Sequence, residues 1–309
     1  MRIGILASEL SKVLCGRPLK EIEGSTLKDY TFKSIEIMKR WGLSCAEFSV
    51  KFDQLEEITK VIAKEDDMDF LLHETGDYSA ARLSYVNKED RKRILEGLRE
   101  TIDYASEGGF TVLTVHPALF NPKKQGYAYS DRAKNYLSSD EAWDVSTRLL
   151  RELTRYAEKK GIVLGLENMP FNIYEDGEVL EAPHLGRTKN EFMRILSAIN
   201  MDGLKMTFDV GHANTICQPA DYINGIVDVI THIHIHDNDG RYDQHASLGA
   251  GTVNFDLLFK VLRNEDYNGT ITIERIVDEN IISDLEKVRH YISKNPERFL
   301  KNLSNGQMT

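Results

Sequence analysis

The sequence predicts an α/β protein of the (β/α)8 TIM-barrel class. Short apolar runs alternate eight times with long amphipathic stretches, which is the order of elements in this fold. Six of the runs end in a histidine, aspartate or glutamate, as expected where parallel strands converge on one polar rim. A doubly wound open sheet, the alternative, has fewer strands and gathers its site at a switch point. The length is normal for one barrel, so a single domain is predicted over residues 1–309.

The apolar runs are the predicted strands, and the stretches between them are the predicted helices. The strands are Arg2–Ala7, Ala46–Val50, Phe70–His73, Val112–His116, Ile162–Glu167, Lys205–Asp209, Ile230–His236 and Thr270–Glu274. The helices are Leu27–Trp41, Leu55–Lys64, Lys88–Glu107, Asp140–Lys160, Lys189–Ile199, Ala220–Val227, Phe255–Arg263 and Ile282–Ser293. Asn87 before Lys88, and Ser139-Asp140 before Glu141, are N-terminal capping signals.

Two connections are longer than the usual βα loop. They are Ala118–Ser139 after the fourth strand and Phe171–Arg187 after the fifth. Both leave the carboxyl ends of strands, so we expect them to overhang the catalytic face. These loops have two interpretations that the sequence supports equally. They form a structural cover of the barrel rim, or they form a lid that contacts substrate.

Composition narrows the classes of partner and compartment. Lysine and arginine number 39 against 49 acidic residues, a net charge of −10, which disfavours a nucleic-acid partner but allows a local basic loop. No stretch approaches the ~20 apolar residues of a membrane span, so no membrane partner is expected. Residues Met1–Leu6 enter a strand at once, unlike a secretory signal. Cys15, Cys45 and Cys217 lack a CxxC pair, which predicts free thiols in a reducing cytoplasm.

The polar residues at the strand ends form the ligand set of zinc or manganese. Asp209-x-x-His212 places a carboxylate on a strand and an imidazole just beyond it. Asp243-x-His245 puts two ligands on one side of an extended loop. The candidate ligands are His73, His116, Glu167, Asp209, His212, His234, Asp243, His245 and Glu274.

The seventh strand carries three histidines that cannot share one role. His232, His234 and His236 alternate with Ile233 and Ile235, so the histidines face the barrel interior and the isoleucines face the helices. The three histidines span about 13 Å at ~3.3 Å per residue, too far for one metal ion. We interpret His234 as the ligand, His232 as a core residue and His236 as a residue near the rim.

Four motifs resemble those of the xylose-isomerase-like TIM barrels, the superfamily of sugar isomerases and epimerases, inosose dehydratase and endonuclease IV. They are LEN at 166–168, FDVGHAN at 208–214, HIHDNDG at 234–240 and DQHASLGAGTVNF at 243–255, and the resemblance covers essentially the whole chain. In the epimerases one divalent ion, often manganese, is held by a Glu, an Asp, a His and a second Glu. The matching residues are Glu167, Asp209, His234 and Glu274, and the resemblance makes the two glutamates the acid/base pair.

Endonuclease IV instead holds three zinc ions with nine ligands, and every ligand type has a counterpart among the nine candidates above. The resemblance therefore implies one to three zinc or manganese ions per chain. The chain departs from the endonuclease after the second strand. Endonuclease IV has a DNA-contacting loop rich in Arg and aromatic residues there, whereas Lys51–Glu57 turns acidic. That difference puts DNA binding in doubt.

Three functions follow as expectations. The first is a metal-dependent isomerase, epimerase or related dehydratase of a small sugar or sugar phosphate, with substrate contacts from His236, Arg241 and Lys123. The second is an endonuclease IV-like phosphodiesterase acting on abasic DNA, and the third is a metal-binding barrel without catalysis. The resemblance implies that homo-oligomers are common, but the sequence shows no exposed apolar stripe that argues for one.

Overall fold

A computed structural model describes residues 1–123, 126–129 and 133–293, and in it eight parallel strands form one sheet. The strands are β1 (Arg2–Ile5), β2 (Cys45–Ser49), β3 (Asp69–His73), β4 (Val112–Val115), β5 (Val163–Glu167), β8 (Leu204–Asp209), β9 (Ile230–Ile235) and β10 (Thr270–Ile273). Their order is β1-β10-β9-β8-β5-β4-β3-β2, and a parallel bridge between Leu6 and Glu47 joins the two end strands. The predicted (β/α)8 barrel is confirmed.

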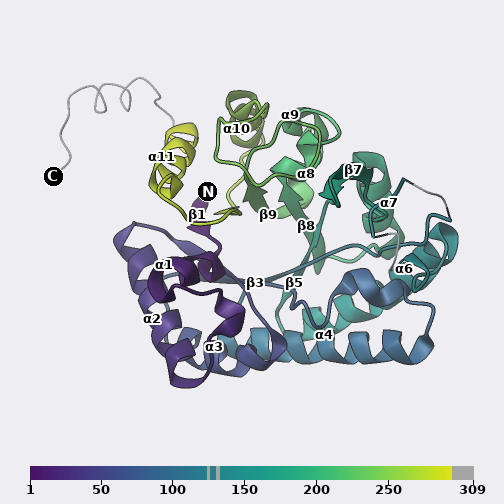
Figure 1. The fold of residues 1–309 in the computed structure, drawn as a ribbon, viewed down its shortest axis with the longest axis horizontal. Helices are drawn as coiled ribbons and strands as arrows, with labels where there is room; N and C mark the ends of the chain where they lie inside the picture. The colour runs from purple at the N-terminus through teal and green to yellow at the C-terminus, as the bar shows by residue number, and fades with distance from the viewer. Residues whose placement is uncertain (124–125, 130–132, 294–309) are drawn as a thin grey trace.

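A helix follows each strand, and Figure 1 shows the helices around the outside of the sheet. They are α2 (Gly24–Arg40), α3 (Leu55–Ile62), α4 (Lys88–Gly108), α6 (Ser139–Lys159), α7 (Lys189–Ile199), α9 (Pro219–Ile223), α10 (Phe255–Asn264) and α11 (Ile281–Ile292). Two shorter helices are α1 (Ser11–Cys15) and α8 (Val210–Asn214), and the 3-10 turns are η1 (Ala7–Leu10), η2 (Leu19–Glu21), η3 (Phe52–Gln54), η4 (Ala80–Ser84) and η5 (Val227–Val229). Asn87 caps α4 as predicted, by accepting a hydrogen bond from the Glu89 N–H.

The two faces of the sheet differ in chemistry because side chains alternate along each strand. Ile233, Ile235 and their equivalents on neighbouring strands pack in the core between sheet and helices. Inside the barrel, Cys45, Leu71 and Val112 form a small apolar cluster. Polar side chains fill other interior positions, including a Thr114–Thr207 hydroxyl contact of 3.1 Å and the fully buried His232 and His234. The predicted orientation of the β9 histidines is confirmed.

Several predicted elements differ from the observed ones. The first strand ends at Ile5 instead of Ala7, because Ala7 begins η1. The predicted helix Ala220–Val227 is split between α9 and η5. The N-cap of α6 is Ser138, one residue before the predicted signal, and it forms a capping box with Glu141.

The predicted loop after the fifth strand contains a β-hairpin. Its strands are β6 (Asn172–Glu175) and β7 (Glu178–Glu181), which pair antiparallel. Asp176 and Gly177 connect them, and both have positive φ, 53° and 89°, as a type I′ hairpin turn requires.

The loop after the fourth strand is described only in part, since residues 124–125 and 130–132 lie outside the described ranges. Residues 294–309 of the predicted domain also lie outside them. Among the helices of the described segments, none combines the length and apolar character needed to cross a bilayer.

Candidate metal centre

The nine candidate ligands all lie at, or just beyond, the carboxyl ends of the strands. His73 ends β3, Glu167 ends β5, Asp209 ends β8, and His234 lies in β9. His116 and Glu274 directly follow β4 and β10, His212 lies in α8, and Asp243 and His245 belong to the loop after β9. The barrel therefore brings together residues that are distant in the sequence.

The central ligand group contains Glu167, Asp209, His234 and Glu274, and one ligand atom from each lies within 4.8 Å of the others. Nδ1 of His234 is 3.0 Å from Oε2 of Glu274, 3.3 Å from Oε1 of Glu167 and 3.9 Å from Oδ2 of Asp209. This is the one-ion set that the family resemblance predicts.

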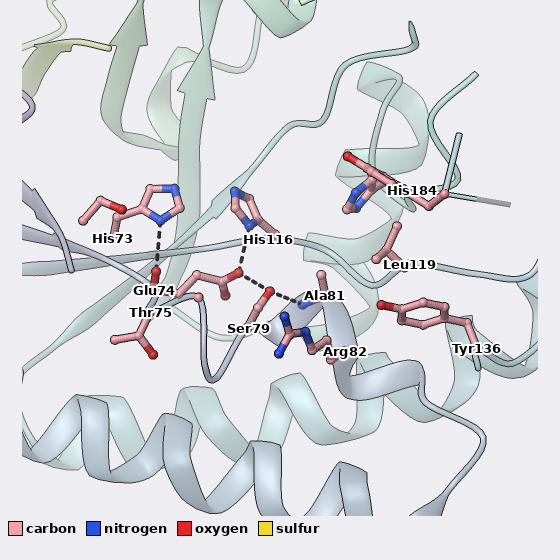
Figure 2. Close-up of a pocket in the computed structure, with 13 residues that line it drawn as sticks. His73, Glu74, Thr75, Ser79, Ala81, Arg82, His116, Leu119, Tyr136 and His184 are labelled. Carbon is pink, nitrogen blue, oxygen red and sulfur yellow. Dashed lines mark hydrogen bonds and ion pairs between the residues drawn. The ribbon is translucent and has the colours of Figure 1, made fainter. Parts of the chain in front are cut away.

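A second group adjoins the first and shares Glu167 with it. Nε2 of His116 and Nε2 of His73 lie 3.1 Å and 3.6 Å from Oε2 of Glu167. Glu74 orients His116 by accepting at 2.8 Å from its other ring nitrogen, Nδ1. Glu74 is itself held by the hydroxyl of Ser79 and, at 2.8 Å, by the N–H of Ala80. Figure 2 shows this arrangement of His73, Glu74, Ser79 and His116.

A third group adjoins the central one through a 3.2 Å contact between His236 and Asp209, and it contains His212, His236, Asp243 and His245. Nε2 of His245 and Nε2 of His212 lie 2.9 Å and 3.4 Å from Oδ2 of Asp243. The other ring nitrogen of each histidine, Nδ1, lies close to a backbone carbonyl oxygen. Nδ1 of His245 is 2.7 Å from the carbonyl oxygen of Glu274, and Nδ1 of His212 is 2.8 Å from that of Asn168. Backbone carbonyls on Nδ1 direct Nε2 toward the carboxylate, as in metal-binding histidines.

Carboxylates and imidazoles of the three groups shift one another's pKa values. Although burial favours the neutral form, the neighbouring His234 and His116 hold the pKa of Glu167 well below its usual value. Burial disfavours the protonated histidine too, yet Asp209 and Asp243 raise the pKa of His212 to about 10. In the same way Asp243 raises the pKa of His245 to about 11. Without a metal ion, these rings hold protons at neutral pH.

The donor set fits divalent cations. Oε2 of Glu167, Oε2 of Glu274 and Oδ1 of Asp243 are buried oxygens that accept no hydrogen bond from the described residues. The nearest ring nitrogens, of His116 and His234, lie 3.1 and 3.0 Å from the Oε2 atoms of Glu167 and Glu274 without forming a hydrogen bond. A buried carboxylate oxygen without a hydrogen bond is costly, and a bound cation would remove that cost. Imidazole nitrogens and carboxylate oxygens at these positions suit zinc or manganese.

Two cavities open beside these groups. One, of about 500 Å³, is lined by seven of the nine candidate ligands together with residues that include Met169, Ile173 and Arg275. The other, of about 340 Å³, shares His73 and His116 with the first and extends to Arg82, Tyr136 and His184. Burial lowers the pKa of His184 to about 3, so this ring is neutral.

The predicted substrate-binding residues are not gathered around these cavities. His236 is fully buried, and its Nε2 lies 3.2 Å from Oδ2 of Asp209. The Arg241 side chain is 70% exposed and lies 4.0 Å from Asp239, and Lys123 is exposed. None of the three lines either cavity described above. Their contact with substrate stays a prediction.

Sequence reasoning missed three acidic residues that support the site. Glu47 lies inside the barrel against His232 and His234. Glu74 orients His116, and Asp237 accepts backbone N–H bonds within the loop that carries Asp243. Glu74 was visible as the residue after His73, but nothing in the local sequence distinguishes Glu47 from a solvent-facing strand residue.

The β6–β7 hairpin is tied to the ligand loop after β9. The Tyr174 and Tyr242 rings stack with centroids 5.2 Å apart, and the Asp243 N–H donates to the Asn172 carbonyl at 3.3 Å. Ile173 lines the larger cavity. The hairpin therefore lies against both the cavity and one predicted ligand.

Comparison with known proteins shows that the chain is similar to sugar isomerases and epimerases. An uncharacterized protein of Methanocaldococcus jannaschii is 33% identical over 67% of this chain and 65% of its own length, so the chain spans about two thirds of that relative. Hydroxypyruvate isomerase of Escherichia coli is 26% identical over 75% of this chain and 83% of its own length. A crystal structure of a D-tagatose 3-epimerase-like protein superposes with a TM-score of 0.71 at 23% identity, over 98% of this chain and 100% of that one. The family described as xylose isomerase-like TIM barrel matches residues 26–299, and the chain belongs to that family.

Proposed function

We propose that this protein is a divalent-metal-dependent isomerase or epimerase of a small sugar or sugar phosphate. The observation that carries the proposal is the pair Glu167 and Glu274, whose carboxylates both lie close to Nδ1 of His234, at 3.3 and 3.0 Å. Relatives named hydroxypyruvate isomerase and fructoselysine 3-epimerase support the same class of reaction.

The paired glutamates suit proton transfer next to a carbonyl group. Glu167, Asp209, His234 and Glu274 would hold the ion. When bound, it would supply polarisation of the substrate carbonyl and its neighbouring hydroxyl, and so would acidify the carbon that bears the hydroxyl. One glutamate removes the proton from that carbon, and the other returns a proton to the opposite face or the adjacent carbon. The low pKa of both carboxylates keeps them ionised in the metal-free protein, so either can accept the proton, and the glutamate that returns one must first take it up.

The cavities accommodate a substrate of this size. Their volumes of about 500 and 340 Å³ fall in the range of small-molecule sites. Arg82, on the wall of the smaller one, donates to the carbonyl oxygen of Asp77 at 3.2 Å and makes no ion pair with a carboxylate among the described residues. A guanidinium in that position suits the phosphate of a sugar phosphate.

Deuterium exchange is the direct test. The metal-loaded protein is incubated in deuterated water with a panel of ketoses and ketose phosphates, and exchange at the carbon beside the carbonyl is followed by NMR. We expect exchange with the wild type and exchange at least about 100-fold slower with Glu167→Gln. Absence of exchange over the whole panel contradicts the proposal.

A second function is favoured by one observation, the side-by-side arrangement of the three ligand groups, two of which share Glu167. Ions held by the three groups would supply a nucleophilic hydroxide and would stabilise the leaving oxygen, which is the chemistry that phosphodiester hydrolysis of abasic DNA requires. The acidic segment Lys51–Glu57 and the net charge of −10 oppose a DNA partner. Cleavage of an abasic duplex, with three zinc ions per chain, would favour this function. A protein that binds metal but is inert in both assays is the non-catalytic alternative.

A further inference from the structure

A buried chain of hydrogen-bonded side chains connects the interior of the barrel to the candidate ligand His234. Glu47, His232 and His234 each have 0% exposed surface. Nε2 of His234 lies 2.8 Å from Oε2 of Glu47 and 3.1 Å from Oε1. Nε2 of His232 lies 2.9 Å from the same Oε2. One carboxylate therefore receives two imidazole nitrogens at hydrogen-bond distance.

The partners fix which nitrogen carries the proton. A carboxylate only accepts hydrogen bonds, so Nε2 of both rings must donate to Glu47. On the far side of His232, Nδ1 lies 2.6 Å from the Thr270 hydroxyl, which can donate to it. Nδ1 of His234 is then the nitrogen that faces Glu167 and Glu274. The chain of hydrogen bonds therefore starts at Thr270, passes through His232 and Glu47, and ends at His234 in the central ligand group.

We infer that Glu47 is a positioning residue, whose carboxylate orients the His234 ring with Nδ1 toward the central group and strengthens it as a metal ligand. The inference rests on one part of the proposed function, the metal site at His234, and does not depend on which reaction the protein catalyses. An ionised carboxylate in a fully buried position is costly unless hydrogen-bonded donors surround it. Holding a ligand ring in one orientation is a role that explains why the barrel interior keeps this charge.

A metal ion bound to Glu47 itself is the competing explanation, since Glu47, His232 and His234 also have ligand atoms within 4.8 Å of one another. That ion would need Nε2 of His234 as a ligand while Nδ1 serves the central group. The ring would then have to lose both of its protons. Hydrogen bonds from Nε2–H of His232 and of His234 to the Glu47 carboxylate explain the 2.9 and 2.8 Å distances, and they do not require His234 to lose both of its ring protons.

The first experiment measures metal affinity in isosteric variants. Zinc and manganese are titrated in competition with a chromophoric chelator into the wild type and Glu47→Gln, which keeps the shape and removes the charge. We expect 10- to 100-fold weaker binding at the central site, the usual effect of removing an outer-shell partner. Asp103→Asn is the control, because Asp103 bonds to Tyr156 and Lys160 where α4 meets α6, away from the candidate ligands. The control is expected to bind metal as the wild type does.

The second measurement needs no variant. Histidine ring ¹⁵N shifts of the zinc-loaded wild type are expected to show Nε2 of His234 protonated and Nδ1 bound to metal. Protonation at Nδ1 overturns the inference, and so does unchanged metal affinity in folded Glu47→Gln. Loss of one whole ion per chain in that variant also overturns it, because Glu47 would then be a ligand. If the affinity falls as expected but no ketose exchanges deuterium, the positioning role stands and the proposed reaction fails.

Discussion

Glu274 and His234 meet at the mouth of the barrel, where Oε2 of Glu274 lies 3.0 Å from Nδ1 of His234. Glu167 reaches the same nitrogen from another strand, at 3.3 Å. The two glutamates differ in their other contacts. Glu167 also faces His73 and His116, whereas the backbone carbonyl of Glu274 accepts from His245. Substitutions of the two residues should therefore have different consequences.

Glu274→Gln should lower the rate of deuterium exchange by about 100- to 10,000-fold, the usual contribution of a general acid or base. Glu167→Gln should have the same effect on exchange and a larger effect on metal content, because Glu167 belongs to two ligand groups. Exchange rates and metal analysis of both purified variants check this. Near-normal exchange by Glu274→Gln would remove it from the acid/base pair.

The flanking ligand groups separate the two proposed reactions. If the isomerase uses the central group alone, His245→Ala should leave ketose exchange within about tenfold of the wild type, the lower end of outer-shell effects. Under the phosphodiesterase proposal the same variant should lose abasic-site cleavage. Chelation of all metal should abolish either activity, and added manganese or zinc should restore it. Exchange that persists after chelation contradicts a metal-dependent isomerase.

The strands and the ligands could be predicted because both leave a local signal. A run such as TFD ending at Asp209, or LLH ending at His73, shows an apolar strand and the polar residue at its tip together. In a barrel every such tip lies on the same rim. The arrangement of ligands into adjoining groups was not predictable, because it depends on how β3, β5, β8 and β9 lie around the barrel.

The supporting residues left weaker signals. Glu47 lies in the middle of Cys45–Ser49, and alternation along a strand does not tell whether a glutamate faces the interior or solvent. Its partners, His232 and His234, are about 185 residues away in sequence. The β6–β7 hairpin leaves a clear sequence signal only at its turn, since Asp176-Gly177 is typical of a type I′ turn. Its flanking strands are short and rich in polar residues, so they lack the alternating apolar pattern of a half-buried strand.

The metal-free protein should lose stability as pH rises above neutrality. Burial opposes protonation of His212, but Asp209 and Asp243 outweigh it and raise its pKa from 6.5 to about 10. A raised pKa in the folded state stabilises the fold fully below pH 6.5, and this contribution disappears as pH rises toward 10. The Tm of chelator-treated protein should fall over that interval.

Two controls identify the source of that pH dependence. Zinc-loaded protein should show a smaller fall in Tm, because the metal replaces the proton on the ring. His212→Gln, measured without metal, should also have a shallower slope than the wild type. A Tm of the metal-free wild type that rises between pH 6.5 and 10 contradicts the assignment.

Asp237 should be a stability determinant of the loop that carries Asp243 and His245. Its buried carboxylate accepts backbone N–H groups of Asn238, Gly249 and Gly251 at 2.9 Å each, and of Val253 at 3.2 Å. Asp237→Asn replaces one acceptor oxygen with a donor and leaves buried N–H groups unpaired. This should lower the free energy of unfolding by about 2–3 kcal/mol, measured by urea denaturation.

The matched control is Asp239→Asn, since Asp239 is exposed in the same loop and accepts a single bond from the Arg241 N–H at 3.0 Å. This control should change the urea midpoint little. Asp237→Asn should also weaken metal binding at the group of His212, Asp243 and His245, because the loop that presents two of its ligands loses its anchor. An unchanged urea midpoint for Asp237→Asn would show that the ligand loop is held by other contacts, such as the Tyr174–Tyr242 stack.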